Sequence, residues 1–280
     1  MTVYVIGDIH GCFYEFQDLL QRVGPVSGDR VICLGDFLDK GPFGAECVRF
    51  ARENGFDSVL GNHDERHLRW SRNERLRRER GRPNNMRPML PSDAVANAKL
   101  TEEDLAWLQG LPRLLEVSVR GLPWVVVHGG LMPDVPIPEQ DLDDVLRLRW
   151  IGLEVEGDFS SPWKTVPVDY ERPETLGRAP EGAIHWTNQW DGPSNVVFGH
   201  EAFSLKEPLH VANEATRFSC WGIDTGAVHG GHLTALALDT SEVFQVRARR
   251  EYMKGPVDFP WTMRMRQLIE HCVPKPRQRP

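Results

Sequence analysis

The feature that most constrains this chain is a polar motif that directly follows its first apolar run. Residues 3–6 are apolar and largely β-branched, as in a buried strand, and they lead into Gly7-Asp8-Ile9-His10-Gly11. In an α/β sheet, ligands bind at the carboxyl ends of the strands, so this motif sets a carboxylate and an imidazole where a ligand would lie. The flanking glycines allow the backbone to turn sharply and to approach that ligand.

The next fifty residues repeat this arrangement. The pattern predicts helices over 12–23 and 44–54, and short strands over 30–34 and 57–60. Each strand ends in a polar loop, and right-handed crossovers place such loops along one edge of a largely parallel sheet. We therefore expect a βαβαβ core whose three loops meet at one edge.

The second half of the chain contains further strands that end in histidine. A hairpin is predicted over 114–127 and is followed by His128-Gly129-Gly130, while the strand 195–198 is followed by Gly199-His200. Further strands are predicted over 221–223 and 233–238. Residues 131–195 are rich in Pro, Trp and acidic side chains and have weak periodicity, which indicates a long excursion over the surface.

Composition excludes several classes of protein. Forty per cent of the residues are apolar, enough for a sizeable core, and no apolar run is long enough to span a bilayer. The chain opens with a strand, so we expect no signal peptide. The five cysteines are scattered and odd in number, which argues against a disulfide framework and for a reducing cytoplasm.

Charge is distributed unevenly along the chain. Residues 66–87 contain nine arginines against two glutamates, a local charge of +7, so the remainder of this chain of net charge −7 carries −14. A mildly acidic protein with one basic segment is not built as a general nucleic-acid binder, and we expect no stable nucleic-acid partner. The segment either clamps a polyphosphate through arginine–phosphate pairs or forms a solvated helix.

The polar residues at the strand ends form a consistent set of metal donors. Mixed carboxylate and imidazole ligands suit Mn²⁺, Zn²⁺ or Fe²⁺, whereas Mg²⁺ and Ca²⁺ prefer oxygen alone. Two such ions joined by a bridging carboxylate polarise a phosphoryl oxygen and generate a hydroxide nucleophile. Any single histidine could instead be a packing or turn residue, but it is improbable that all of them follow strands by chance. The set comprises Asp8, His10, Asp36, Asn62, His63, His128 and His200.

These motifs resemble the signature of the phosphoprotein-phosphatase-type, calcineurin-like metallophosphoesterases. Gly-Asp-Ile-His-Gly, Gly-Asp-x-x-Asp-Lys-Gly, Gly-Asn-His-Asp, His-Gly-Gly and Gly-His occur in family order over residues 7–200, and Asp-Thr-Gly with Gly-Gly-x-Leu-Thr extends the match to 234. Within the family, the pattern is most similar to the bacterial diadenosine tetraphosphatases and the phosphatases like them. The resemblance implies an α/β fold, a two-sheet αββα sandwich of the metallophosphoesterase type.

The resemblance also implies roles for individual residues. One metal ion would be bound by Asp8 and His10, the second by Asn62, His128 and His200, and Asp36 would bridge them. His63 would be the general acid, with Asp39 orienting its imidazole. The family usually has Arg where this chain has Lys40, so Lys40 would share the binding of the substrate phosphate with Arg66 or another arginine of the basic segment. The cofactors would be two divalent ions, Mn²⁺ first, with Fe, Zn, Co or Ni as alternatives.

The expected function is metal-dependent hydrolysis of a phosphoester or phosphoanhydride, with a dinucleoside polyphosphate such as diadenosine tetraphosphate as substrate. The alternatives are a protein phosphatase, acting on phosphoserine, phosphothreonine or phosphotyrosine, and an inactive module that binds metal and phosphate. Trp186 and Trp190 either stack a nucleobase or, as we favour, pack a loop onto the core. We expect one domain over 1–255, with an arginine-rich helical insert at 66–112, a substrate-side excursion at 131–195 and an extension at 256–280.

Overall fold

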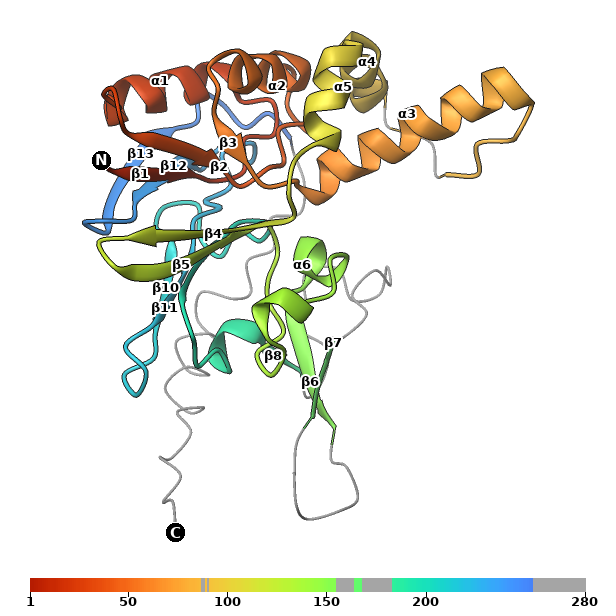
Figure 1. Cartoon of the computed structure of the whole chain (residues 1–280). Coiled ribbons are helices and arrows are strands. Elements are labelled where there is room, and N and C mark those ends of the chain that lie inside the picture. Colours follow the sequence, from red (N-terminus) through yellow and green to blue (C-terminus); the bar gives the residue numbers. More distant parts are fainter. Residues whose placement is uncertain (87–88, 90, 155–163, 168–182, 254–280) are drawn as a thin grey trace.

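The computed structural model describes residues 1–86, 89, 91–154, 164–167 and 183–253. Two five-stranded sheets face each other, and helices pack outside the first of them (Figure 1). This confirms the predicted α/β architecture with two sheets. Over the described residues, no helix is long and apolar enough to cross a membrane.

The first sheet contains the predicted βαβαβ core. Its first three strands run parallel, as the crossovers require; a later strand pairs antiparallel with the first of them, and the last strand pairs antiparallel with that one. The order is β13 (Glu242–Arg247), β12 (His232–Ala237), β1 (Val3–Ile6), β2 (Arg30–Cys33) and β3 (Asp57–Ser58).

The second sheet brings together strands from the middle of the chain. Its central strand, β9, pairs in parallel with β5 and β11, so the loops that follow β9 and β5 leave from the same edge. The order is β10 (Leu209–Ala212), β11 (Ser219–Gly222), β9 (Asn195–Phe198), β5 (Leu122–Val127) and β4 (Leu114–Val119).

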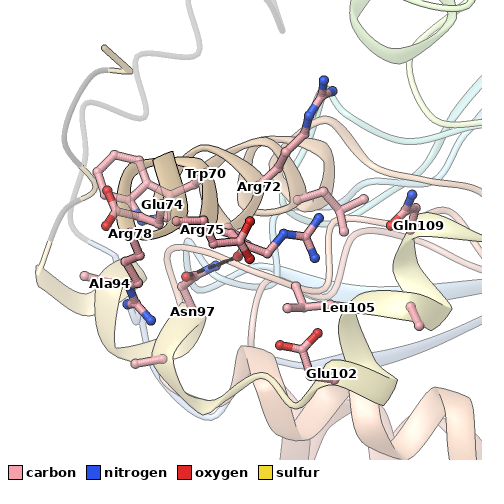
Figure 2. Close-up of a pocket in the computed structure, with 15 residues that line it drawn as sticks. Trp70, Arg72, Glu74, Arg75, Arg78, Ala94, Asn97, Glu102, Leu105 and Gln109 are labelled. Carbon is pink, nitrogen blue, oxygen red and sulfur yellow. Dashed lines mark hydrogen bonds between the residues drawn. The ribbon is translucent and has the colours of Figure 1, made fainter. Parts of the chain in front are cut away.

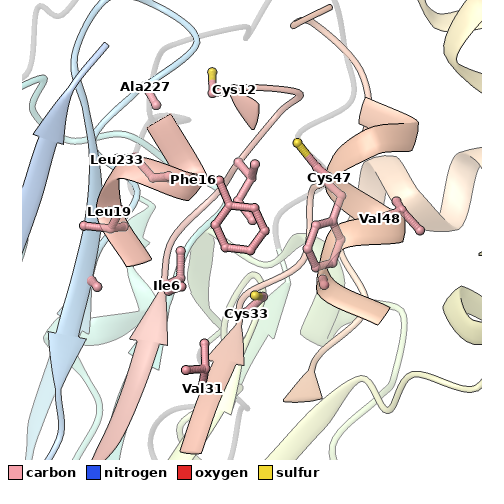
Figure 3. Close-up of a cluster of buried hydrophobic side chains, with 14 of the residues drawn as sticks. Ile6, Cys12, Phe16, Leu19, Val31, Cys33, Cys47, Val48, Ala227 and Leu233 are labelled. Carbon is pink, nitrogen blue, oxygen red and sulfur yellow. The ribbon is translucent and has the colours of Figure 1, made fainter. Parts of the chain in front are cut away.

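Strand alternation builds the core on both faces of the first sheet. Val3 and Val5 of β1 pack between the two sheets, whereas Ile6 packs under the helices. In β2, Val31 and Cys33 likewise face the helices (Figure 3). Because both faces are covered, these strands read as continuous apolar runs rather than as alternating patterns.

Five helices connect the strands of the first half. α1 (Phe13–Val23) and α2 (Gly44–Glu53) lie over the outer face of the first sheet, while α3 (Asn62–Arg80) projects away from it (Figure 1). α4 (Pro91–Lys99) and α5 (Glu102–Gln109) pack beside α3. α5 begins with a capping box between Thr101 and Asp104, which satisfies two backbone amides at its start.

The described part of the segment 131–195 contains more secondary structure than its weak periodicity indicated. This part contains α6 (Asp144–Arg147) and a third sheet of β7 (Lys164–Pro167), β6 (Trp150–Glu154) and β8 (Ile184–His185). Two short 3-10 helices also occur, at Ile137–Glu139 and Trp186–Asn188. Trp186 and Trp190 are buried against the second sheet, which supports the packing interpretation of these residues. The predicted extension 256–280 lies outside the described residues.

Candidate metal centre

The loops after the strands hold unusual backbone conformations where the predicted site residues lie. The backbone is left-handed, with φ between 43° and 70°, at His10, Asp36, Asp39, Lys40 and His200. Residues other than glycine rarely adopt this region, and such strain persists where surrounding contacts enforce it, often at functional sites. The turns therefore aim these side chains into one shared space.

Two glycines permit the close approach of neighbouring loops. A Cβ atom on Gly61 would collide with the backbone and side chain of Asp36, and one on Gly199 would collide with the carboxylate of Asp8. The backbone N–H of His200 donates to both oxygens of Asp8, at 3.1 Å each. The end of β9 is thereby joined to the end of β1, although the two strands belong to different sheets.

Asp36 lies at the centre of the site. One of its carboxylate oxygens, Oδ1, is 3.4 Å from Nε2 of His128, and the other, Oδ2, is 3.4 Å from Nε2 of His10 and 4.0 Å from Nε2 of His63. Over the described residues, two groups of donor atoms are compact enough to hold a metal ion, and both include Asp36. The first group adds His10 and His63, and the second adds Asp8 and His128.

The hydrogen bonds of two histidines fit metal binding. Nδ1 of His10 lies 2.8 Å from the carbonyl oxygen of Leu38, and Nδ1 of His128 lies 2.7 Å from that of Leu34. A carbonyl can only accept, so Nδ1 carries the hydrogen, and Nε2, which faces Asp36, is the nitrogen left to bind a cation. The donor set therefore fits a divalent cation, with a backbone carbonyl fixing each ring.

The first residue of α3 completes the donor set. Oδ1 of Asn62 lies 2.9 Å from Nε2 of His128 and 2.9 Å from Nδ1 of His200. These three atoms come from the start of a helix and the ends of β5 and β9. The seven predicted donors thus meet at one place, although five separate segments supply them.

Burial sets the electrostatics of this cluster. Burial raises the pKa of Asp8 well above its ordinary value, and the nearby charges of Asp224 and Asp36 add to this effect. Burial also acts to raise the pKa of Asp36, but His128 and His63 hold it well below the usual range. Burial acts to lower the pKa of His128, but the charge and hydrogen bond of Asp36, together with Asp8 and the carbonyl of Leu34, raise it to about 9. An added cation would stabilise the charged forms of the two buried carboxylates.

The predicted acid and its partner are in contact. Nδ1 of His63 lies 2.7 Å from Oδ2 of Asp39, and Nη1 of Arg66 lies 3.6 Å from the same oxygen. Burial acts to raise the pKa of Asp39, but the hydrogen bonds from His63 and His67 hold it well below its ordinary value. Lys40 lies on the other side of the site, with Nζ 2.8 Å from Nε2 of His10.

Sequence reasoning missed three supporting residues. Asp64 is fully buried and accepts from the backbone N–H groups of Phe37 and Leu38, at 3.1 and 3.2 Å, so it holds the loop after β2. His67 hydrogen-bonds Asp39, and Asn97 hydrogen-bonds His67. The spacing of four between His63 and His67 placed both on one face of a helix and could have revealed the second histidine. No local signal pointed to Asn97.

The arginine-bearing helix borders a separate groove. This groove of about 810 Å³ lies between α3, α4 and α5, and Arg72, Arg75 and Arg78 line its α3 side (Figure 2). Asn97 lines the α4 side and also contacts buried His67. Asp39, which hydrogen-bonds His67 in turn, is not among the lining residues.

Comparisons with known proteins agree with this geometry. Residues 1–217 match the model of the calcineurin-like phosphoesterases. Symmetrical bis(5'-nucleosyl)-tetraphosphatases from Chromohalobacter salexigens and Aromatoleum aromaticum are 30% and 29% identical to the chain, over 86% and 90% of it and 96% and 98% of their own lengths.

Solved structures of related proteins also resemble this chain in fold. The crystal structure of a protein assigned as a diadenosine tetraphosphatase aligns with a TM-score of 0.66 and 26% identity, covering 88% of this chain and 93% of that one. A metallophosphoesterase from Sphaerobacter thermophilus, at 18% identity, shares the fold with a TM-score of 0.51 and covers 89% of this chain and 88% of its own. The chain therefore belongs to the calcineurin-like phosphoesterases, enzymes that use divalent metal ions to hydrolyse phosphate ester or anhydride bonds.

Proposed function

We propose that this enzyme hydrolyses dinucleoside polyphosphates, with diadenosine tetraphosphate as the representative substrate, at a centre of two divalent ions. The observation that carries the proposal is the position of Asp36, whose two oxygens face two different groups of donors. The substrate class is supported by relatives named as symmetrical bis(5'-nucleosyl)-tetraphosphatases, which the chain matches over nearly their whole length.

The division of the donors between the two ions is the one that the resemblance to the family implies. Asp8 and His10, from the loop after β1, would hold one ion together with Asp36. The other would be held by Asn62, His128 and His200, also with Asp36. Mixed oxygen and nitrogen donors favour Mn²⁺, with Fe, Zn, Co or Ni as alternatives. When bound, the two ions would polarise the phosphoryl oxygens and supply an activated water as nucleophile.

His63 would donate a proton to the leaving oxygen. Its side chain is one-quarter exposed, so Nε2 can reach a substrate, while Nδ1 is held by Asp39. A buried carboxylate on the far side of the ring fixes the orientation of the imidazole. Asp39 therefore acts as the partner of the acid.

Lys40 and Arg66 would bind the outer oxygens of the substrate phosphates. Each lies one contact away from the donor set, Lys40 beside His10 and Arg66 beside Asp39. A lysine ammonium offers charge without the planar fork of arginine, so Arg66 would supply the bidentate contact.

A substrate panel tests the proposal. The Mn²⁺-loaded enzyme would be assayed with diadenosine tetraphosphate, inorganic polyphosphate and phosphoserine, phosphothreonine and phosphotyrosine peptides, with products separated by chromatography. We expect kcat/KM to be highest for diadenosine tetraphosphate. A higher value for the peptides would instead establish the protein-phosphatase alternative on the same centre.

We also propose a cytoplasmic location and a single catalytic domain over residues 1–255. The location is supported by four described cysteines, Cys12, Cys33, Cys47 and Cys220, which are buried and unpaired. Such thiols suit a reducing compartment.

A further inference from the structure

A chain of hydrogen bonds runs from the general acid into the helical region beside it. Asp39 accepts from two imidazoles at once, Nδ1 of His63 through Oδ2 and Nε2 of His67 through Oδ1. His67 is fully buried, and its Nδ1 lies 3.0 Å from Nδ2 of Asn97 on α4. The amide of Asn97 is held in turn by the hydroxyl of Ser71, with Nδ2 3.0 Å from Oγ.

The chemistry of these groups fixes where the hydrogens lie. An ionised carboxylate can only accept, so Nε2 of His67 must carry a hydrogen. The amide nitrogen of Asn97 can only donate, so Nδ1 of His67 must accept. His67 is therefore a neutral ring in one defined tautomer, and both of its nitrogens and both oxygens of Asp39 have a hydrogen-bond partner.

This arrangement fixes the carboxylate of Asp39. Because Oδ1 is hydrogen-bonded to His67, the carboxylate cannot rotate without breaking a buried hydrogen bond. Oδ2 is thereby kept on Nδ1 of His63. Arg66 adds a second link to α4, since its Nη1 lies 3.6 Å from Asp39 and 3.8 Å from Asp93.

We propose that His67 and Asn97 are positioning residues for the general acid. Together they fix the carboxylate of Asp39 and, through it, the imidazole of His63. This inference rests on the proposed role of His63 and extends the catalytic apparatus from the strand-end loops to α4. A buried histidine that only filled space in the core would affect stability but not proton transfer.

Leaving groups of different basicity separate the two possibilities. Phenoxide is a more basic leaving group than 4-nitrophenoxide, so phenyl phosphate depends more on a general acid than 4-nitrophenyl phosphate does. With Mn²⁺, His67→Leu should lower kcat about 10- to 100-fold for phenyl phosphate and less than about threefold for 4-nitrophenyl phosphate, with KM unchanged. Equal losses on both substrates, or no loss, would overturn the proposal.

Conservative and control variants sharpen this test. His67→Gln keeps an N–H near the position of Nε2 and should recover most of the kcat for phenyl phosphate. Asn97→Leu should also lower kcat more for phenyl phosphate than for 4-nitrophenyl phosphate, but by less than His67→Leu does. Ser71→Ala leaves the hydrogen bond between Asn97 and His67 in place and should behave like the wild type. Failure of His67→Gln to restore any activity would count against the proposal. If His67→Leu does not fold, as judged by circular dichroism, the comparison of Asn97→Leu with Ser71→Ala decides.

A spectroscopic measurement is independent of turnover. The imidazole ¹⁵N–¹H NMR spectrum of the metal-free protein should show His67 as the Nε2–H tautomer, and its Nδ1 signal should shift in Asn97→Leu. An Nδ1–H tautomer would overturn the proposal. Lack of activity on diadenosine tetraphosphate would count only against the proposed substrate, because the aryl phosphates and the NMR spectrum test His67 separately.

Discussion

The loops that face the metal centre and the outer half of α3 are both strongly charged, but their charges lie in opposite environments. Asp8 and Asp36 are 3% and 1% exposed, whereas Arg72, Arg75 and Arg78 are exposed to solvent. A buried charge is costly unless a partner compensates it, and a hydrated charge costs little and contributes little. The charges of the metal-facing loops therefore need bound cations to compensate them. The exposed arginines of α3 should affect a substrate only through long-range electrostatics.

The largest effect should come from the residue shared by both donor groups. Asp36→Asn should lower kcat/KM for diadenosine tetraphosphate about 10⁴-fold or more, since several kcal/mol of charge stabilisation are lost. Bound metal, measured by elemental analysis, should fall as well. Asp57→Asn, on the surface and paired with Arg30, is the control and should change neither. A fully active Asp36→Asn enzyme with two ions per chain would refute the bridging assignment.

Replacing the acid should give a loss that depends on the substrate. His63→Asn should lower kcat for phosphoserine peptides by roughly 10²- to 10⁴-fold, because a serine alkoxide leaves poorly without a proton. Hydrolysis of 4-nitrophenyl phosphate should be largely spared, with diadenosine tetraphosphate between the two. A uniform loss across the series would mean that His63 positions the phosphate instead.

A single methyl group should disturb the metal-facing loops. Gly199→Ala introduces a Cβ against the carboxylate of Asp8, so metal affinity should fall about tenfold. Gly110→Ala is the matched control, because its Cβ would make only ordinary contacts at 3.4 Å and beyond. Isothermal titration calorimetry measures the metal affinity of both variants. Equal affinities would show that the approach of β9 to Asp8 does not shape the centre.

In the helical region, a buried ion pair should affect stability and leave catalysis unchanged. Asp104 joins α5 to α2 through Arg49 and Arg52, at 2.9 and 3.2 Å. Burial acts to raise the pKa of Asp104, but the Thr101 amide and Arg49 hold it below its ordinary value. Asp104→Asn should therefore cost about 1–3 kcal/mol at neutral pH, measured by urea unfolding.

The same carboxylate predicts a pH dependence. Its stabilising contribution is fully present above the ordinary pKa of an aspartate and is lost as the pH falls through the lower, folded-state value. Wild type and Asp104→Asn should therefore converge in stability in acid. A difference that stayed constant from pH 7 to pH 3 would assign the effect to packing instead.

The smallest effect should come from the exposed arginines. Replacing Arg72, Arg75 and Arg78 together by Gln should raise KM for diadenosine tetraphosphate about two- to threefold at low salt, and 0.5 M salt should abolish the difference. KM for 4-nitrophenyl phosphate should not change. Arg77→Gln, which breaks an ion pair with Glu74, is the single-site control. A salt-independent rise in KM would instead indicate direct phosphate contact.

The sequence predicted the core of the fold and the convergence of the donors because both follow local patterns. Apolar runs with a polar residue at the end specified β1, β2, β5 and β9, and crossover handedness brought the ends of β1 and β2 together. In contrast, β6, β7 and β8 lie in a segment with little periodicity, and their pairing is set by tertiary contacts that local sequence does not carry.

The supporting residues of the site were harder to predict for a related reason. The partner of Asp39 identified from the sequence was His63, which lies in a family motif, whereas Asn97 lies in none and reaches His67 across thirty residues and a separate helix. A hydrogen bond of this kind leaves no signature in either segment alone. The start of α3 was also missed, because Asn62 and His63 were placed in a loop and instead form the first turn of a helix.

Anomalous diffraction from crystals grown with Mn²⁺ tests whether Asp36 joins two metal ions. We expect two anomalous peaks per chain, one on each side of the Asp36 carboxylate. The first should lie beside His10 and Asp8, and the second beside Asn62, His128 and His200. A single peak, or two peaks of which only one contacts Asp36, would contradict the bridging assignment.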